Sequence, residues 1–122
     1  MTEIEQRIAV AEFCAWHLQP SVCVGGWNIH HGTTKIGSFW FNLEKAPTLL
    51  DCIEGIPDYL HDLNAMHDAE DSPKLDGIRS EYVHQLGIVV IGVGEPIQWI
   101  TVHASAAQRA EALLRTVGKW KD

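Results

Sequence analysis

Apolar residues in the first part of the chain repeat with the spacing of a helix. They recur at steps of four, three, four and three residues, namely Ile4, Ile8, Ala11, Ala15 and Leu18. This spacing places them on one face of an α-helix. Thr2 and Glu5 have the spacing of a capping box, in which each side chain satisfies a backbone N–H group at the start of the helix. We therefore predict one helix that ends at Pro20.

The pattern then changes to a period of two. Trp27–His31 and Lys35–Leu43 predict two strands joined by the turn His31-Gly32-Thr33-Thr34. One face of the second strand carries Phe39, Phe41 and Leu43, and the other carries Ile36, Ser38, Trp40 and Asn42. Because alternate residues point to opposite faces, the first group is expected to meet the core. Trp40 lies on the second face, which we expect another element to cover.

Helical spacing returns in the middle of the chain. Thr48–Glu54 predicts a short helix that ends at Gly55. Pro57 suits the first position of a longer helix extending to about Asp71, because the missing N–H of proline is not needed there. Ser72-Pro73 begins a further helix, expected to end at Gly87. Its apolar face consists of Leu75, Ile78, Tyr82 and Leu86. The acidic residues expected to point to water are Asp62, Asp68, Glu70 and Asp71.

The last third predicts two strands and a helix. Ile88–Val93 is continuously apolar, which is typical of a central strand buried on both faces. Gly92–Pro96 predicts a turn, and Ile97–His103 a fourth strand. The final helix begins at a second capping box, Ser105 with Gln108, and ends at Gly118. Its expected core residues are Ala106, Ala110, Leu113 and Val117. This order of elements predicts an α+β fold, a small mostly antiparallel sheet with helices on both faces, or α-β-α sandwich.

Composition is that of a globular domain. The chain has 122 residues, of which 46% are hydrophobic and 20% charged, so we predict a single domain spanning residues 1–122. The net charge is −7, and the whole imbalance lies in Pro47–Glu81, with nine acidic and two basic residues. An acidic chain of this kind argues against general binding of nucleic acid or of an anionic membrane.

Targeting signals and cysteines predict a cytoplasmic protein. Ile88–Ile91, the longest apolar run, is too short to span a bilayer. Met1–Arg7 lacks the basic and then apolar pattern of a signal peptide. The three cysteines, Cys14, Cys23 and Cys52, form no CxxC pair and are expected to be reduced thiols.

Three segments carry a resemblance to a known family. They are Arg7–Glu12 with Cys14–Trp16, Pro57–Glu70, and His103–Arg115 closed by Gly118-Lys119-Trp120. The middle segment contains the pattern Asp-Tyr-Leu-x-Asp-Leu-Asn-Ala-Met-His. Together they resemble the phage ABA-sandwich domain. The resemblance implies a phage-encoded α-β-α sandwich acting in the cytoplasm of the host cell, and it supplies no catalytic residue.

Motifs of catalysis and metal binding are absent from the sequence. His61 and His67 are six positions apart, so on a helix they point about 120° apart and do not converge on one ion. The zinc-protease, EF-hand, nucleophile-elbow, P-loop and dinucleotide-binding patterns do not occur. We therefore expect no cofactor and no metal, and favour a non-enzyme. Thiol catalysis by Cys14 or Cys23 with a distant histidine stays open.

Tryptophan is the most informative residue type. The five are Trp16, Trp27, Trp40, Trp99 and Trp120. They indicate either core packing or a surface for a planar ligand or a protein. The predicted hairpin gathers aromatic, cationic and hydroxyl groups suited to a base and a phosphate, namely Trp27, His30, His31, Thr33, Thr34, Lys35 and Trp40. His103 and Arg109, near the start of the last helix, form a second candidate anion site.

Two functional hypotheses follow. In the first, the protein sequesters a small nucleotide-like immune signal of the host, as phage sponge proteins do, and so counters host defence. In the second, its acidic surface inhibits a host protein by docking on it, as a nucleic-acid mimic would. A homodimer or higher homo-oligomer is expected, because so many tryptophans should leave an apolar patch exposed.

Overall fold

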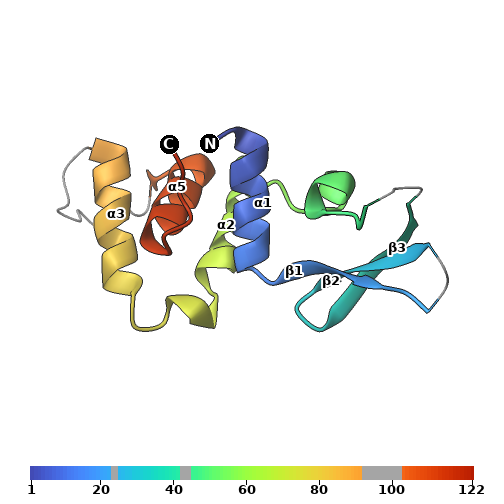
Figure 1. The fold of residues 1–122 in the computed structure, drawn as a ribbon. Coiled ribbons are helices and arrows are strands. Elements are labelled where there is room, and N and C mark those ends of the chain that lie inside the picture. The colour runs from blue at the N-terminus through green and yellow to red at the C-terminus, as the bar shows by residue number, and fades with distance from the viewer. Residues whose placement is uncertain (23–24, 42–44, 92–102) are drawn as a thin grey trace.

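The computed structural model describes residues 1–22, 25–41, 45–91 and 103–122. The helices are α1 (Glu3–Phe13), η1 (Leu49–Gly55), α2 (Leu63–Glu70), η2 (Pro73–Leu75), α3 (Arg79–Ile91) and α5 (Ala106–Thr116), where η denotes a 3-10 helix. The strands are β1 (Trp16–Pro20), β2 (Gly26–His31) and β3 (Thr34–Trp40). The predicted α+β class is therefore confirmed. Figure 1 shows the larger helices gathered on one side of the molecule and the sheet beside α1.

Helix α1 begins as predicted and ends early. Thr2 and Glu5 form the capping box, with hydrogen bonds of 3.0 and 3.1 Å between side chain and backbone. The helix ends because Ala15 adopts a φ of +67°, which turns the chain. The prediction of helix up to Pro20 was wrong, since Trp16–Pro20 is strand β1.

The three strands form an antiparallel sheet in the order β1-β2-β3. The hairpin of β2 and β3 is confirmed, and Gly32 supplies the positive φ that its turn requires. Trp27 lies opposite Phe39, and His30 lies opposite Lys35. Between these pairs the register shifts by a β-bulge. The bulge changes which side chains share a face of the sheet.

The middle of the chain contains η1, confirmed with its end at Gly55. The prediction that Pro57 begins the next helix was wrong. Helix α2 begins six residues later because the Asp62 carboxylate caps it, accepting from the N–H groups of Asn64 and Ala65 at 3.0 and 3.2 Å. A side chain in this role satisfies N–H groups that would otherwise lack a partner.

Helix α3 replaces an expected strand. Ile88–Ile91 was expected to lie in a central strand, yet these residues form the last turns of α3, and the helix continues through Gly87. Tyr82 and Leu86 are buried on its inner face. Packing of α3 against α5 thus prevails over the strand preference of its β-branched residues. Ile88 and Ile91 lie exposed rather than in a core.

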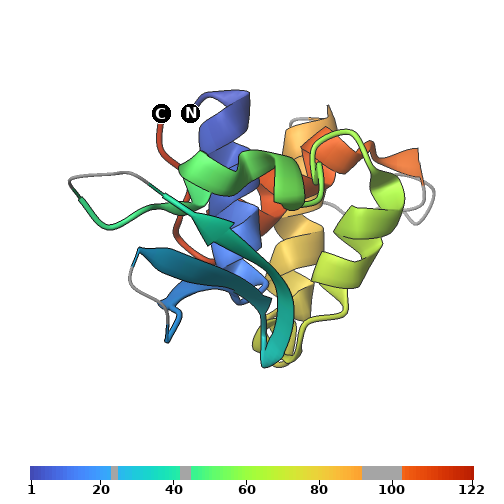
Figure 2. The same cartoon turned by 90° about the vertical axis from the view of Figure 1, so that its right-hand side faces the viewer.

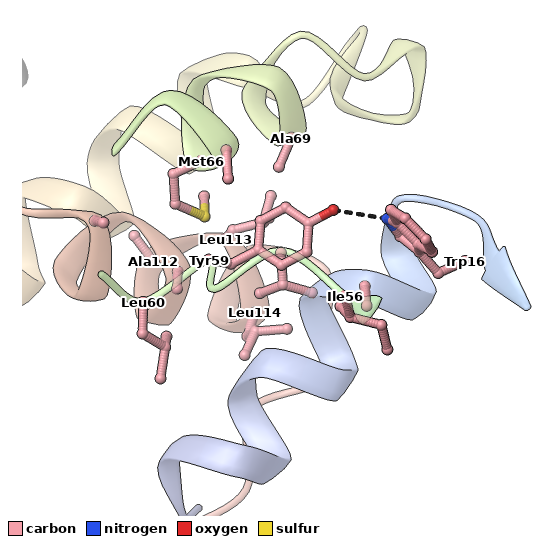
Figure 3. Close-up of a cluster of buried hydrophobic side chains, with 14 of the residues drawn as sticks. Trp16, Ile56, Tyr59, Leu60, Met66, Ala69, Ala112, Leu113 and Leu114 are labelled. Carbon is pink, nitrogen blue, oxygen red and sulfur yellow. Dashed lines mark hydrogen bonds between the residues drawn. The ribbon is translucent and has the colours of Figure 1, made fainter. Parts of the chain in front are cut away.

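Helix α5 forms the centre of the helical part, and α1, α2 and α3 all pack against it (Figure 2). Its Ser105–Gln108 capping box is confirmed, and Gly118 follows its end with a φ of +76°. Four of its residues are completely buried: Ala110, Ala112, Leu113 and Leu114. Figure 3 shows Leu113 and Leu114 in one cluster with Tyr59 and Met66.

Two contacts join the sheet side to the helices. The buried Trp16 indole N–H donates to the Tyr59 hydroxyl at 2.9 Å (Figure 3). The Arg7 guanidinium of α1 donates to carbonyl oxygens of Ile53 and Pro57, at 2.9 and 3.0 Å, at the end of η1. The first bond joins β1 to the segment before α2, and the others join α1 to the end of η1.

Several predictions lie outside the described residues. They concern Cys23, Asn42, Leu43, Trp99, the turn Gly92–Pro96 and the strand Ile97–His103 except for its last residue. Among the helices of the described ranges, none has the length and apolar character needed to cross a membrane.

Candidate functional site

The predicted hairpin cluster divides between the two faces of the sheet. Residues directly opposite each other on neighbouring strands share a face. His31 lies opposite Trp16, and Trp27 opposite Phe39, on the inner face that meets the core. Lys35 and Trp40, by contrast, lie on the opposite, outer face, so the structure does not bring the whole cluster into one pocket.

The inner-face members contribute to packing. His31 stacks on Trp16, with ring centroids 4.6 Å apart and planes within 6°. Trp27 is half-buried. The Trp16 indole bonds to Tyr59, and burial raises the pKa of the Tyr59 hydroxyl. Thr33 and Thr34 lie exposed at the hairpin turn, where β2 leads into β3.

The outer face carries two stacked imidazoles. The rings of His17 and His30 lie 5.3 Å apart with planes within 14°. His17 Nδ1 donates to the Ala15 carbonyl oxygen at 3.0 Å, so its Nε2 accepts from the Gln19 amide at 2.9 Å. This arrangement fixes the orientation of His17 and places the imidazole pair next to Lys35, which lies opposite His30. The Nε2 atom of His30 is buried and has no hydrogen-bond partner among the described residues.

Further along the same face, polar side chains lead to an exposed indole. Ser38 donates to the Asn28 side chain at 2.9 Å. Trp40 is 71% exposed, so the prediction that another element covers it is wrong for the described residues. Gly25 lies beside the indole, since a Cβ at this position would be in van der Waals contact with the ring at 3.8 Å.

We use the name outer sheet face for this surface. It consists of His17, Gln19, Asn28, His30, Lys35, Ser38 and Trp40. An exposed indole can stack on a planar ring, the amide and hydroxyl groups can form hydrogen bonds, and the ammonium group can pair with an anion. The surface is therefore equipped for non-covalent recognition.

Arg109 and His103 lie apart from the hairpin. Arg109 is 5% exposed, and its guanidinium pairs with Glu70 at 3.0 Å and donates to the Ala104 carbonyl at 3.1 Å. Tyr82 donates to the same carboxylate at 2.6 Å, and burial raises the pKa of this tyrosine. Arg109 therefore neutralises a half-buried carboxylate, and Glu70 does not point to water as expected. His103 is exposed before the start of α5.

The two cysteines that the structure describes are not activated as nucleophiles. Cys14 and Cys52 are free thiols, and burial raises the pKa of both. A raised pKa disfavours the thiolate that acts as nucleophile. Within the described ranges no three histidine, cysteine, aspartate or glutamate side chains lie close enough to hold a metal ion.

A groove that the sequence analysis missed runs between α1 and the residues after α5. It has a volume of about 810 Å³ and is lined by apolar side chains together with Lys74, Lys119 and Lys121. Lys74 is far from Lys119 and Lys121 in the sequence, so no local motif reveals that it lies near them. The alternation Lys119-Trp120-Lys121 is the one local signal that the sequence offers.

Comparisons of the chain with protein-family models, with curated proteins and with solved structures found no match. The resemblance to the phage ABA-sandwich domain therefore stays a prediction, and the binding surface is identified from the geometry.

Proposed function

We propose that this protein binds and sequesters a small nucleotide-like anion on the outer sheet face. The observation that supports this most is the placement of an exposed tryptophan and a lysine on one face of one strand. Their sequence separation of five would put Lys35 and Trp40 on opposite faces of a regular strand. The β-bulge removes that difference, because Lys35 lies opposite His30 and Trp40 opposite Gly26.

The dimensions of the face suit a ligand of dinucleotide size. Lys35 and Trp40 are separated by about 15 Å at the rise of a β-strand. A base stacked on the indole would thus extend a phosphate towards the ammonium group, passing the amide and hydroxyl of Asn28 and Ser38. The local cation matters because the chain as a whole carries −7 and would otherwise repel a phosphate.

The biological role belongs to the same proposal. The resemblance to a phage family and the small size of the chain favour a protein that captures a nucleotide signal of the host immune response. This step is an analogy with phage proteins that act by stoichiometric capture. It requires binding tight enough to compete with the host receptor, and no chemical conversion of the ligand.

Isothermal titration calorimetry against a panel of cyclic and linear di- and mononucleotides tests the proposal. We expect one member to bind at micromolar concentration or tighter. Trp40→Ala should weaken it about tenfold or more, since stacking on an aromatic side chain contributes about 1–3 kcal/mol. Lys35→Ala should weaken it and reduce its dependence on salt. Trp120→Ala is the matched control, a half-buried indole after α5. If no nucleotide binds, the proposal fails.

A second candidate function rests on the acidic stretch. Eight of the nine acidic residues in Pro47–Glu81 are exposed, namely Asp51, Glu54, Asp58, Asp62, Asp68, Asp71, Asp76 and Glu81. Such a surface favours docking on a basic host protein. Asp68→Lys with Asp71→Lys should abolish capture of such a partner from host lysate without affecting nucleotide binding. Asp62 is unsuitable for this test because it caps α2.

A further inference from the structure

We propose that the groove beside α1, called the α1 groove below, binds an amphipathic anion: an alkyl or aryl body that carries a single carboxylate, sulfonate or phosphate. This site is separate from the outer sheet face and does not depend on the function proposed for that face. The termini lie close together at this side of the molecule (Figures 1 and 2), and the Met1 N–H donates to the Lys121 carbonyl at 2.9 Å.

The walls of the α1 groove are apolar. Ile8, Ala9 and Phe13 contribute from α1, and Val117 contributes from the end of α5. All four are half-buried, so they retain surface that a ligand could remove from water. The volume of about 810 Å³ lies within the range of small-molecule sites. These walls fit an alkyl chain or an aromatic ring.

The rim of the groove is cationic. Lys74, Lys119 and Lys121 line it, and they are three of the five lysines in the chain. The Lys74 ammonium donates to the Phe13 carbonyl at 2.7 Å and lies 5.4 Å from the Phe13 ring, which holds it at the mouth. In the part of the chain that the structure describes, neither Lys119 nor Lys121 forms an ion pair.

The acidic groups of the groove do not cancel this charge. Glu5 and Glu12 also line it, but Glu5 accepts from the Thr2 N–H at 3.0 Å as part of the capping box. Together with the N-terminal ammonium group of Met1, the three lysines make four cationic groups, which face two carboxylates, one of which already has a donor. A local excess of positive charge in a chain of net charge −7 favours an anion and disfavours a cation.

The same charges argue against a second copy of the chain as occupant. In a symmetric contact the α1 groove of one copy would face that of the other, which would set lysines against lysines. The volume is also that of a small-molecule site rather than of an extended protein interface. An amphipathic small molecule satisfies both the apolar walls and the cationic rim.

The experiment uses 8-anilinonaphthalene-1-sulfonate, an aryl sulfonate whose fluorescence rises in an apolar site. We expect saturable binding at one site per chain. Octanoate should displace the probe at least about fivefold more effectively than octanol, which has the same chain without the charge. Raising the salt concentration should weaken binding of the probe, because screening reduces attraction between exposed charges.

Charge reversals locate the binding. Lys119→Glu and Lys121→Glu should each raise the dissociation constant several-fold, and together about tenfold or more. Lys45→Glu is the matched control, since it makes the same charge change at an exposed lysine that does not line the groove. Ala9→Trp fills the groove and should abolish binding of both probe and octanoate. Circular dichroism confirms that each variant retains its helix content.

The outcomes separate this site from the other proposals. Binding that responds to Lys119→Glu and Lys121→Glu but not to Lys45→Glu supports it. Failure of both ligands to saturate below millimolar concentration overturns it, as does equal displacement by octanol or equal effects of all three reversals. The proposal is also overturned if the chain self-associates, seen as a concentration-dependent mass in light scattering, and this association prevents the probe from binding. Nucleotide titrations report on the outer sheet face independently.

Discussion

The helical part and the sheet of this protein differ in how they are stabilised. Helix α5 is packed by α1, α2 and α3, and four of its residues are completely buried. The strands contribute only Trp16 and Ile29 to the buried apolar core among the described residues, and one face of their sheet is open. The comparison indicates that the helices supply most of the folding free energy. The outer sheet face and the exposed rim of the α1 groove are then free to carry recognition.

The largest effect is expected where charge is buried in the helical part. Arg109→Ala removes the guanidinium partner of Glu70 and leaves its half-buried carboxylate with Tyr82 and His67 as its side-chain contacts. Removing one member of a buried ion pair costs about 3–5 kcal/mol. Urea denaturation should show a loss of this size in the free energy of unfolding. Arg109→Met with Glu70→Met should recover much of it, and a double variant as unstable as the single one would contradict this account.

The next effect compares an apolar side chain from each part. Leu113→Ala opens a cavity at a completely buried position in α5 and should cost about 2–5 kcal/mol. Ile36→Ala on β3, where the side chain is 50% exposed, should change stability by less than about 0.5 kcal/mol. Urea denaturation of both variants measures the contrast. Similar losses would mean that Ile36 is packed as tightly as Leu113, against the proposed contrast between sheet and helices.

The contact between the two parts has an intermediate effect. Tyr59→Phe removes the acceptor of the Trp16 indole and should cost about 1–2 kcal/mol at neutral pH. Burial raises the pKa of Tyr59 above its ordinary value of 10.0, so the folded state binds this proton more tightly than the unfolded state. The contribution of the protonated Tyr59 hydroxyl to the free energy of unfolding is therefore complete below pH 10 and decreases as the pH rises above it.

Denaturation curves at pH 8 and pH 10.5 test that dependence. The protein should lose stability between the two values, and Tyr59→Phe and Tyr82→Phe should each lose less, because the pKa of Tyr82 is raised in the same way. An equal loss in the parent and both variants would assign the alkaline sensitivity to other groups.

Sequence patterns predicted the elements that local interactions determine. The capping boxes at Thr2 and Ser105 follow from hydrogen bonds within four residues, and the hairpin follows from alternation and the turn at Gly32. The errors occur where tertiary contacts decide. Ala15 adopts a positive φ without being glycine, and α3 extends through a β-branched run because it packs on α5.

The candidate sites were predicted less well for related reasons. Phe39 and Trp40 lie on opposite faces as predicted, but a single-residue bulge moves Lys35 to the face of Trp40 rather than that of Phe39. Arg109 pairs with Glu70, thirty-nine residues away, which no local pattern reveals. The α1 groove combines residues from three distant segments and becomes visible only in the folded chain.

The smallest effect on stability should come from the outer sheet face itself. Trp40→Ala replaces a side chain that is 71% exposed and should change the free energy of unfolding by no more than about 0.5 kcal/mol. If the predicted homodimer forms through this face, the same variant should shift the mass in light scattering from a multiple of 13.6 kDa towards a single chain. If Trp40→Ala abolishes nucleotide binding without changing stability or mass, Trp40 contacts the ligand. If the variant loses stability in a protein that is monomeric throughout, the indole packs against its own chain. This result would contradict the conclusion that the helices supply stability while the outer sheet face is free for recognition.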